Sequence, residues 1–421
     1  MTYYELTRCV CCESKNLGLT LDLGSQPLAN DFRPVGSGEC ELYPLALMTC
    51  FNCWHSQLSH CVERELIFAN YAYVSGTSNT LSRYFCWFAE SLAKCLEHGS
   101  RILDIAANDG SLVEALESQG FDVVGIDPAK NVVTDALKKG RHLIEGYWPR
   151  DANRLARGFD AIICMNVLAH VDNPREFLRT CEEYLNREGI VIIQSSQARM
   201  FGNGEFDTCY HEHISFFNSN SIRILGEAVG LRLVSVFFTK IHGDSCVYVF
   251  AKVGAKDLTD INTKFSRDEF FIDENVYEYE NEIGLFDKQT YFKFELQSMN
   301  LINRFRERVS HYRENGFGIV FVGAAAKAMT IINAARVEPD LFLDEAPLKI
   351  GNLVPGCRLV VKDLQALCDV KRRVLVVITA WNFSREILEK LSVFNLPKGS
   401  VYYCYFPTES ILPISDALTS C

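Results

Sequence analysis

Groups that can move protons gather in one short stretch of the chain. Tyr210, His211, Glu212 and His213 follow one another, inside a longer stretch 206–217 that aromatic residues close at both ends. Titratable groups set among apolar side chains often have shifted pKa values, and such groups cluster at functional sites. The stretch therefore indicates acid–base catalysis, whereas a polar turn with histidines bonded to the backbone is the plainer alternative.

Two cysteine pairs near the start indicate a metal site. Each has the spacing C-x2-C, and the pairs are Cys9 with Cys12 and Cys50 with Cys53. A pair presents two thiolates through a tight turn, and four thiolates close a structural zinc site. Cys11, inside the first pair, or more weakly His55, could replace one ligand. We expect a small zinc-stapled module over residues 1–65, because a metal compensates for a small core.

A βαβ pattern follows this module. Residues 101–105 have the composition of a buried strand, 111–119 that of a helix, and 121–127 that of a second strand ending in Asp127. An acidic side chain at that place accepts hydrogen bonds from a ribose diol. The intervening turn lacks the G-x-G-x-x-G pattern, and its acidic side chains would repel phosphates. The pattern therefore favours S-adenosylmethionine over NAD.

The alternation of strands and helices continues to residue 194. Strands are expected at 159–166 and 190–194, with a helix at 174–185 between them. Ligands of open α/β sheets bind outside the carboxyl ends of the strands. We expect the loops after these strands, and the stretch 206–217 shortly beyond the last one, to line a single crevice. His242, in a later glycine turn, either faces this crevice or closes the turn.

A second α/β unit is expected after a long amphipathic helix at 291–315. Residues 318–327 repeat the strand–turn–helix pattern, and further strands are expected at 341–344 and 374–378. Two nucleotide-type units indicate an ancient duplication or two ligands. Lys327 would stand at a helix N-terminus, where it suits a phosphate group, or it is an ordinary surface lysine.

Composition limits the class of protein. At 421 residues, two or three domains are expected. The net charge of -11 argues against nucleic acid as the principal partner, because phosphate backbones need clustered Lys and Arg. The first residues lack the regions of a signal peptide, and no apolar run could span a membrane. We expect a cytoplasmic protein whose 17 cysteines are free thiols and metal ligands.

Several motifs, in this order, resemble the three-domain sugar C-methyltransferases of deoxysugar pathways. They are the cysteine pairs around 21–30, the loop 71–80, Asn108-Asp109-Gly110, Ala169-His170-Val171-Asp172, Tyr210-His211-Glu212-His213 and Ala380-Trp381-Asn382-Phe383. The resemblance covers nearly the whole chain. It implies an α/β protein with a zinc-binding module (1–65), a central class I S-adenosylmethionine methyltransferase domain of Rossmann-like fold (66–255), and a second Rossmann-like α/β domain that holds substrate (256–421).

The resemblance also implies the residues of the site. Zinc would lie on the four paired cysteines, and S-adenosylmethionine would contact Asp104, Ala106, Asn108, Asp109, Asp127, Pro128, Asn166 and His170. The substrate, an NDP-4-keto-6-deoxysugar methylated at C3, would contact His242, Ser245 and Lys327. His213 would be the base, Tyr210, His211 and Glu212 would orient it or the sugar, and Tyr73 would close over the pocket.

These residue types suit the implied reaction. A ketone acidifies the adjacent C–H bond, so a neutral imidazole near its ordinary pKa can remove that proton. A donor such as Tyr210, or a protonated imidazole, would stabilise the resulting enolate. The enolate carbon then attacks the methyl group in line with the leaving sulfur, so positioning supplies much of the rate.

The chain departs from the family at a few positions near the expected nucleotide. The family turn Gly-Ala-Pro-Ala-Lys-Gly-Asn-Thr reads Gly-Ala-Ala-Ala-Lys-Ala-Met-Thr over residues 323–330. Asp244 stands where the family has a glycine, Val247 where a basic residue occurs, and Phe216 where tyrosine is common. A second hypothesis is therefore C-methylation of another carbonyl compound. A third, from a different class, is a catalytically silent scaffold that keeps the fold.

Overall fold

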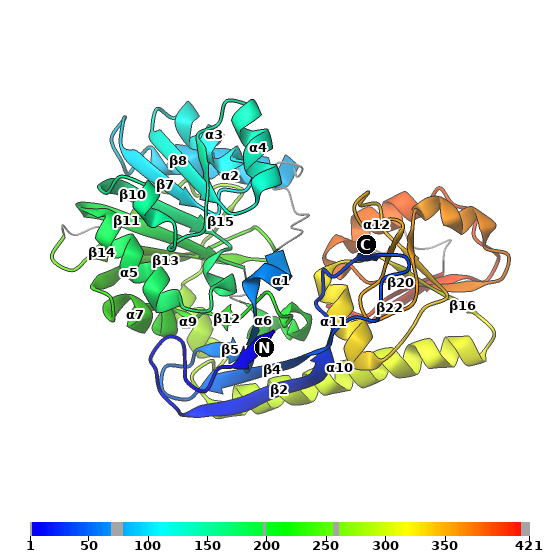
Figure 1. Ribbon diagram of the computed structural model, residues 1–421. Coiled ribbons are helices and arrows are strands. Elements are labelled where there is room, and N and C mark those ends of the chain that lie inside the picture. Colours follow the sequence, from blue (N-terminus) through cyan, green and yellow to red (C-terminus); the bar gives the residue numbers. More distant parts are fainter. Residues whose placement is uncertain (1, 69–78, 197–198, 256–260, 414–421) are drawn as a thin grey trace.

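The computed structural model describes residues 2–68, 79–196, 199–255 and 261–413. Within them the chain forms a four-stranded N-terminal sheet, an eight-stranded central sheet and a six-stranded C-terminal sheet. In Figure 1 the central and C-terminal sheets are separate α/β bodies, and the N-terminal sheet and the long helix α10 (Lys288–Glu314) run beneath them. No helix in these described ranges is long and apolar enough to cross a membrane.

The N-terminal sheet takes one of its strands from the middle of the chain. Its order is β12-β5-β4-β2. The strands are β2 (Leu17–Gln26), β4 (Tyr43–Cys50), β5 (Ser56–Leu58) and β12 (Ser215–Phe216). β12 begins two residues after His213, so the predicted catalytic stretch ends as a strand of the cysteine-bearing module. Two smaller sheets consist of one strand pair each: β1 (Tyr3–Glu5) pairs with β6 (His60–Val62), and β3 (Arg33–Pro34) pairs with β18 (Asn352–Leu353). The short helix α1 (Arg64–Phe68) follows β6.

The central sheet has the order β15-β13-β14-β11-β10-β7-β8-β9. The parallel strands are β7 (Arg101–Ile105), β8 (Asp122–Asp127), β9 (Leu143–Glu145), β10 (Phe159–Met165) and β11 (Leu185–Ser195). The antiparallel strands are β13 (Leu231–Thr239), β14 (Ser245–Lys252) and β15 (Phe271–Ile272). Its helices are α2 (Asn79–Leu92), α3 (Ser111–Ser118), α4 (Lys130–Lys138), α5 (Pro174–Tyr184), α7 (Ser219–Glu227), α8 (Ile261–Lys264) and α9 (Val276–Glu282). The short helix α6 (Met200–Asn203) follows β11 and packs toward α10 instead.

The apolar strands of this sheet are buried because helices cover both faces. Ile162 on β10 belongs to the core on one face and Ile163 to the core on the other, as expected when successive side chains point to opposite sides. The helix α5 begins where the sequence predicts it, with the Asn173 side chain capping its first turn and Pro174 at its first position. The predicted parallel βαβ arrangement is confirmed.

The C-terminal sheet repeats the same strand order. Its order is β19-β17-β16-β20-β21-β22, with all pairs parallel except the last. The strands are β16 (Gly318–Val322), β17 (Leu341–Leu343), β19 (Val361–Lys362), β20 (Val374–Ile378), β21 (Val401–Cys404) and β22 (Ser410–Pro413), with helices α11 (Ala326–Ala335) and α12 (Ser384–Leu391). In both sheets the first strand lies between the second and the fourth, which is the arrangement that leaves a ligand crevice there.

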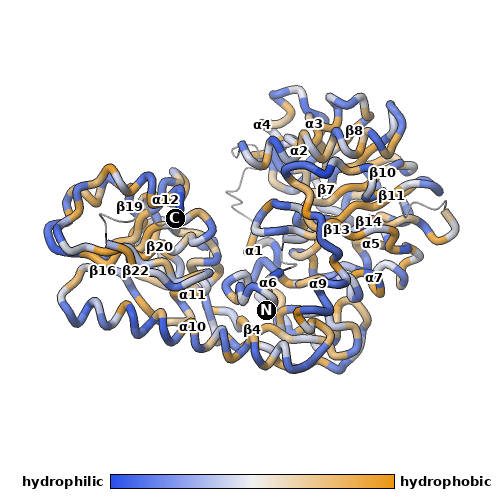
Figure 2. The backbone as a smooth tube through the Cα atoms, turned by 180° about the vertical axis from the view of Figure 1, so that it is seen from behind, coloured by the Kyte–Doolittle hydropathy of each residue, from blue (hydrophilic) through white to orange (hydrophobic). Residues whose placement is uncertain are grey.

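Helix α10 ties the N-terminal sheet to the C-terminal one. Its buried side chains recur every three or four residues, from Tyr291 and Phe294 to Phe305 and Val309. Phe294 and Phe305 share one core with Leu45 of β4 and with the C-terminal strands. Hydrophobic residues lie along the strands of both α/β bodies in Figure 2, while α10 alternates between polar and apolar residues. The predicted connecting helix at 291–315 is confirmed.

The residues after the predicted boundary at 255/256 continue the central body. β15 pairs with β13 of the central sheet, and α9 packs beside it, so residues 261–282 belong with the central body. The helix α10 then leads from the central body to the C-terminal sheet. A two-residue strand carries no periodic pattern, so the sequence contains no signal for β15.

Candidate active site

The turn after β7 is shaped as a cradle for a nucleoside. Ala106 and Asn108 both have left-handed backbone conformations, with φ of 57° and 51°. Such values are uncommon for residues other than glycine and concentrate at functional turns. Gly125 on β8 makes room for the turn, because a Cβ there would lie 2.6 Å from the Cβ of Ala107. The turn is thus held close to the end of β8.

Asp127 closes this cradle at the end of β8. Its Oδ2 accepts a hydrogen bond from the Asn108 N–H at 2.8 Å, and its Oδ1 accepts one from the Ala129 N–H at 2.8 Å. Pro128 lies in the chain between Asp127 and Ala129. Burial raises the pKa of Asp127, and the two N–H donors oppose that shift. Each carboxylate oxygen keeps a second lone pair for a ribose hydroxyl.

Two further acidic residues line the turn in different ways. Burial, and then the charge of Asp127, raise the pKa of Asp104 well above its ordinary value. Asp109 instead lies 3.5 Å from the guanidinium of Arg141 and accepts from the Ser111 N–H at 3.2 Å. Asp109 is thus engaged at the start of α3, and Asp104 is the carboxyl group that a cationic ligand would return to its charged form.

The loop after β10 links the cradle to the histidine stretch. Asn166 has φ of 57°, and its buried Oδ1 has no hydrogen-bond partner within the described residues. His170 follows, and its Nδ1 lies 2.7 Å from the carbonyl oxygen of Glu212. A carbonyl oxygen only accepts, so Nδ1 of His170 carries the hydrogen. The unpartnered amide oxygen and the Asp127 lone pairs fit S-adenosylmethionine, which would be held by these residues.

His213 is fixed in one orientation by the backbone. Its Nδ1 lies 2.8 Å from the Thr208 carbonyl oxygen, so Nδ1 carries the hydrogen and donates it. In the neutral ring the lone pair is then on Nε2, which meets the Tyr210 hydroxyl at 2.9 Å. The His170 and His213 ring centres are 5.0 Å apart. The structure therefore brings the predicted base together with Tyr210 and with His170, on the loop after β10.

The electrostatics of His213 differ from the expectation of an ordinary pKa. Burial, and then the charge of a protonated His170, lower the pKa of His213 well below 6.5. Burial also lowers the pKa of His170. Both imidazoles are therefore neutral at neutral pH, which keeps Nε2 of His213 able to accept a proton. Because its pKa is lowered, His213 is a weaker base, and a nearby negative charge must stabilise the imidazolium when Nε2 accepts a proton.

His211 and Glu212 face the N-terminal module. Nε2 of His211 lies 3.3 Å from the carbonyl oxygen of Tyr43, and burial lowers the pKa of His211 to about 4. Glu212 accepts a hydrogen bond on Oε1 from the Asn30 side chain at 2.5 Å, while burial raises the pKa of Glu212 to about 7. Sequence patterns give no signal for the contact of Asn30, which lies far from Glu212 in the chain.

The two residues expected to contact substrate after β13, His242 and Ser245, lie at the turn into β14. Ser245 is fully buried, and its hydroxyl donates to the Ile241 carbonyl at 2.8 Å, so it closes the turn. The His242 side chain is exposed, with φ of 56°. Asp244, the negative charge added to this turn, lies 3.0 Å from Nε of Arg199, which packs between Phe238 and Tyr279. The added charge is thus matched within the protein.

Lys327, on the first turn of α11, contacts Glu205, the residue just before the stretch 206–217. Its ammonium lies 3.2 Å from the Glu205 carboxylate and 4.4 Å from the ring centre of Trp381. Trp381 in turn donates from Nε1 to Oδ2 of Asp207 at 2.6 Å. The Ala380-Trp381-Asn382-Phe383 motif was the only sequence signal for this contact, and it assigns Trp381 no role. The predicted Tyr73 lies outside the described residues.

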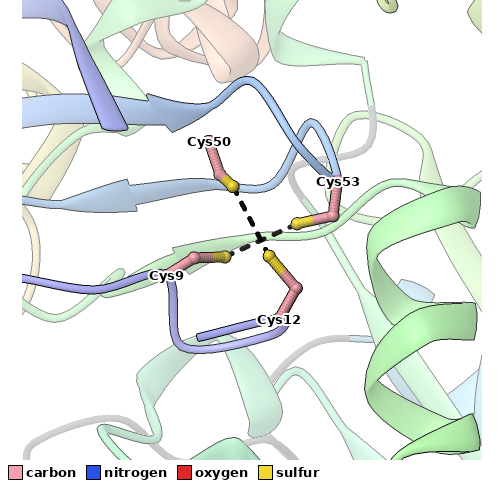
Figure 3. Close-up of side chains that lie close together, drawn as sticks. All are labelled: Cys9, Cys12, Cys50 and Cys53. Carbon is pink, nitrogen blue, oxygen red and sulfur yellow. Dashed lines mark hydrogen bonds between the residues drawn. The ribbon is translucent and has the colours of Figure 1, made fainter. Parts of the chain in front are cut away.

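The four predicted zinc ligands lie together. Sγ of Cys9 is 3.5 Å from Sγ of Cys53, the same distance separates Cys12 from Cys50, and all four sulfur atoms lie within 4.8 Å of one another (Figure 3). A Zn–S distance of about 2.3 Å gives a tetrahedron with edges of about 3.8 Å, so the donor set fits a zinc ion. Cys11 and His55 are not among the gathered donors; His55 instead packs on Phe217, its ring centre 4.9 Å away.

Comparison with known families assigns a description to each part of the chain. Residues 9–68 match a family model described as a zinc binding domain, residues 80–236 one described as a methyltransferase domain, and residues 269–407 one described as a C-methyltransferase C-terminal domain. These matches follow one another in the order of the N-terminal, central and C-terminal sheets.

Individual relatives match either nearly the whole chain or less than half of it. C-methyltransferase NovU of Streptomyces niveus is 26% identical and covers 98% of both chains. Ubiquinone biosynthesis O-methyltransferase of Caulobacter sp. (strain K31) is 39% identical over 23% of this chain and 40% of its own. A solved TehB-like SAM-dependent methyltransferase of Corynebacterium glutamicum covers 45% of this chain and 93% of its own, with 20% identity and a TM-score of 0.31.

Proposed function

We propose that this chain, a member of the three-domain S-adenosylmethionine-dependent C-methyltransferase family, methylates C3 of an NDP-4-keto-6-deoxysugar. The family is an enzyme family that uses S-adenosylmethionine and carries a zinc-binding domain, and both groups suit the residues described above. The observation that carries the proposed reaction is the His213–Tyr210 pair, whose Nε2 and hydroxyl lie 2.9 Å apart beside the nucleoside cradle.

Proton removal is assigned to Nε2 of His213. The C3–H bond breaks, its proton passes to Nε2, and its electron pair moves through C4 to the ketone oxygen. Because the Thr208 carbonyl holds the hydrogen on Nδ1, Nε2 is the nitrogen that presents a lone pair. The imidazolium that forms is buried, so the adjacent negative enolate compensates for the lowered pKa of His213.

Tyr210 is assigned to the enolate oxygen. Its hydroxyl bonds to Nε2 of His213 while that nitrogen is unprotonated. As the C3 proton approaches Nε2, the hydroxyl turns away from that lone pair and donates to the enolate oxygen. Bound S-adenosylmethionine supplies the electrophilic methyl group. Asn166 and Asp127 orient the nucleoside so that the carbon and the methyl group meet in line.

The C-terminal unit supports a nucleotide-bearing acceptor. Oδ2 of Asp344, at the end of β17, accepts from the Ala324 N–H at 2.6 Å, and Oδ1 accepts from the Ala346 N–H at 2.8 Å. Asp127 makes the same two kinds of bond in the central unit. A second ribose can therefore be held by the same chemistry, and Lys327 lies on the adjacent helix α11 for a phosphate.

One observation favours a second candidate, the C-methylation of another ketone. Ala328 and Met329, which replace a glycine and an asparagine of the family turn, are buried in the core of the C-terminal unit. Their side chains offer no hydrogen-bond donor to a nucleotide. This candidate keeps the enolate chemistry of His213 and changes only the group that anchors the acceptor.

Incubation with labelled methyl donor and a panel of nucleotide 4-ketosugars tests the proposal. We expect label in one or more of these sugars and, without donor, solvent deuterium at the carbon next to the ketone. His213→Gln should lower the deuterium exchange by about 100-fold or more, the usual contribution of a positioned base. Label only in ketones without a nucleotide would select the second candidate. Failure to bind S-adenosylmethionine in calorimetry would exclude an enzyme.

A further inference from the structure

A buried carboxylate just before the catalytic pair is held by the C-terminal unit. Asp207 is 2% exposed, and its Oδ2 accepts from Nε1 of Trp381 at 2.6 Å and from the Tyr405 hydroxyl at 3.2 Å. Trp381 follows β20, and Tyr405 directly follows β21. Both donors therefore lie at the carboxyl ends of neighbouring strands of the C-terminal sheet.

The C-terminal unit makes a second contact two residues further on. The Thr330 hydroxyl of α11 donates to the Cys209 carbonyl at 3.2 Å. Asp207 and Cys209 are the two neighbours of Thr208. The peptide group of Thr208 is thus fixed on both sides by one and the same body, across the junction with the central unit.

The Thr208 carbonyl is the group that sets the tautomer of the base. It accepts from Nδ1 of His213 at 2.8 Å, which leaves the Nε2 lone pair for Tyr210 and for the substrate. We propose that Asp207 is a positioning residue, through which Trp381 and Tyr405 of the C-terminal unit hold the Thr208 carbonyl and thereby the Nδ1–H tautomer of His213. The inference rests on His213 being the base of the proposed reaction.

The orientation of the Asp207 carboxylate depends on its two donors in the C-terminal unit. Oδ1 of Asp207 has no hydrogen-bond partner among the described residues, so Trp381 and Tyr405 are the donors that orient the carboxylate. Without them the carboxylate has neither of its donors, and the short helical turn 206–208 loses its side-chain hydrogen bonds to the C-terminal unit. A displacement of about 1 Å at a catalytic group can lower a rate about 100-fold, whereas binding of the methyl donor needs none of these contacts.

The variants that test the inference remove the hydrogen-bond donors to Asp207 and keep the aromatic rings that carry them. The double variant Trp381→Phe/Tyr405→Phe deletes both hydrogen bonds to Asp207 and leaves two aromatic rings in place. Tyr402→Phe is the matched control, because the Tyr402 hydroxyl, on β21 itself, is buried without a hydrogen-bond partner in the described part of the chain. Zinc-loaded protein is used throughout, with bound S-adenosylhomocysteine for the tautomer measurement and with S-adenosylmethionine for the kinetics.

The first readout is the tautomer of His213, which needs no acceptor. In protein labelled with 15N-histidine, the His213 signal is identified by its loss in His213→Gln. We expect the Nδ1–H tautomer in the wild type and in Tyr402→Phe, and a mixture of both tautomers in the double variant. An unchanged Nδ1–H tautomer in the double variant would overturn the inference, whatever the acceptor proves to be.

The second readout is kinetic and uses the acceptor identified above. We expect the double variant to lose about 10- to 100-fold in kcat, with affinity for S-adenosylmethionine within about twofold of the wild type. The Thr208 bond raises the pKa of His213, so its loss should move the acidic limb of the kcat profile to lower pH. If the double variant merely contained less folded protein, the apparent kcat would fall by the same factor at every pH and the acidic limb would not shift. That result would also contradict the inference.

Discussion

Glu212 meets three parts of the chain through separate atoms. Its Oε1 accepts from Asn30 of the N-terminal module, its carbonyl accepts from His170 of the central unit, and His213 follows it in the chain. The carboxyl group is partly shielded from water, and this burial raises its pKa to about 7. Glu212 is therefore the one member of the stretch 210–213 whose pKa is raised into the neutral range by burial.

The raised pKa of Glu212 has a consequence for stability. Between its ordinary value of 4.5 and about 7, the folded protein binds a proton that the unfolded chain has released. This contribution is full below pH 4.5 and is lost as the pH rises through 7. Glu212→Gln should therefore flatten the fall in stability between pH 4.5 and 7, measured as urea midpoints. The exposed Glu97→Gln is the control, and parallel profiles for the wild type and Glu212→Gln would contradict the prediction.

Sequence patterns identify residues whose partners are near in the chain. Asp127 could be predicted because it ends a strand at a fixed distance from the turn that it closes. Ser245 could not be placed, because the use of its hydroxyl depends on the path of the turn around Ile241. Asn30 and Trp381 lie in quoted motifs, yet their partners Glu212 and Asp207 are more than 170 residues away.

The zinc site and the catalytic stretch share elements of structure. Cys50 ends β4 and Cys53 precedes β5, and β5 pairs with β12, whose Ser215 lies opposite Gln57. The Leu58 N–H also donates to the Ile214 carbonyl at 2.9 Å. The C-x2-C spacing predicts the metal site, but a two-residue strand such as β12 has no periodicity to predict it by.

Removal of zinc should therefore loosen the catalytic stretch. After chelation, we expect the amide hydrogens of residues 56–58 and 214–216 to exchange faster with deuterium, because structural zinc contributes directly to the folding of its site. Methyl transfer should fall in parallel, and added Zn²⁺ should restore both. Unchanged protection at 214–216 in protein shown to be free of zinc would separate the two sites and refute this coupling.

At the scale of the whole molecule, two α/β sheets of like strand order face the stretch 205–213 from opposite sides. Lys327 and Trp381 reach it from the C-terminal sheet, and His170 reaches it from the central sheet. The βαβ alternation predicts each sheet separately. It does not predict their arrangement, which depends on α10 and on a core shared between distant segments.

Asp127 and Asp344 offer a matched pair of variants for the two crevices. Asp127→Asn should weaken S-adenosylmethionine binding about 10- to 100-fold, since a hydrogen bond to a charged group contributes about 1.5–3 kcal/mol, and should leave KM for the proposed nucleotide-sugar unchanged. Asp344→Asn should have the opposite pattern. Calorimetry with the donor and steady-state kinetics with the acceptor measure the two effects. Equal changes in both quantities for either variant would argue against separate nucleoside sites.

The strand that β12 adds to the N-terminal sheet also dictates an order of events during synthesis. About 160 residues separate Gln57 from its partner Ser215. At about 5–20 residues per second, the ribosome leaves the edge of β5 unpaired for about 8–30 s. All four cysteines emerge before that interval begins, so zinc can close the module first. His213, the proposed base, thus takes its place only when β12 pairs with the earlier-formed edge strand β5.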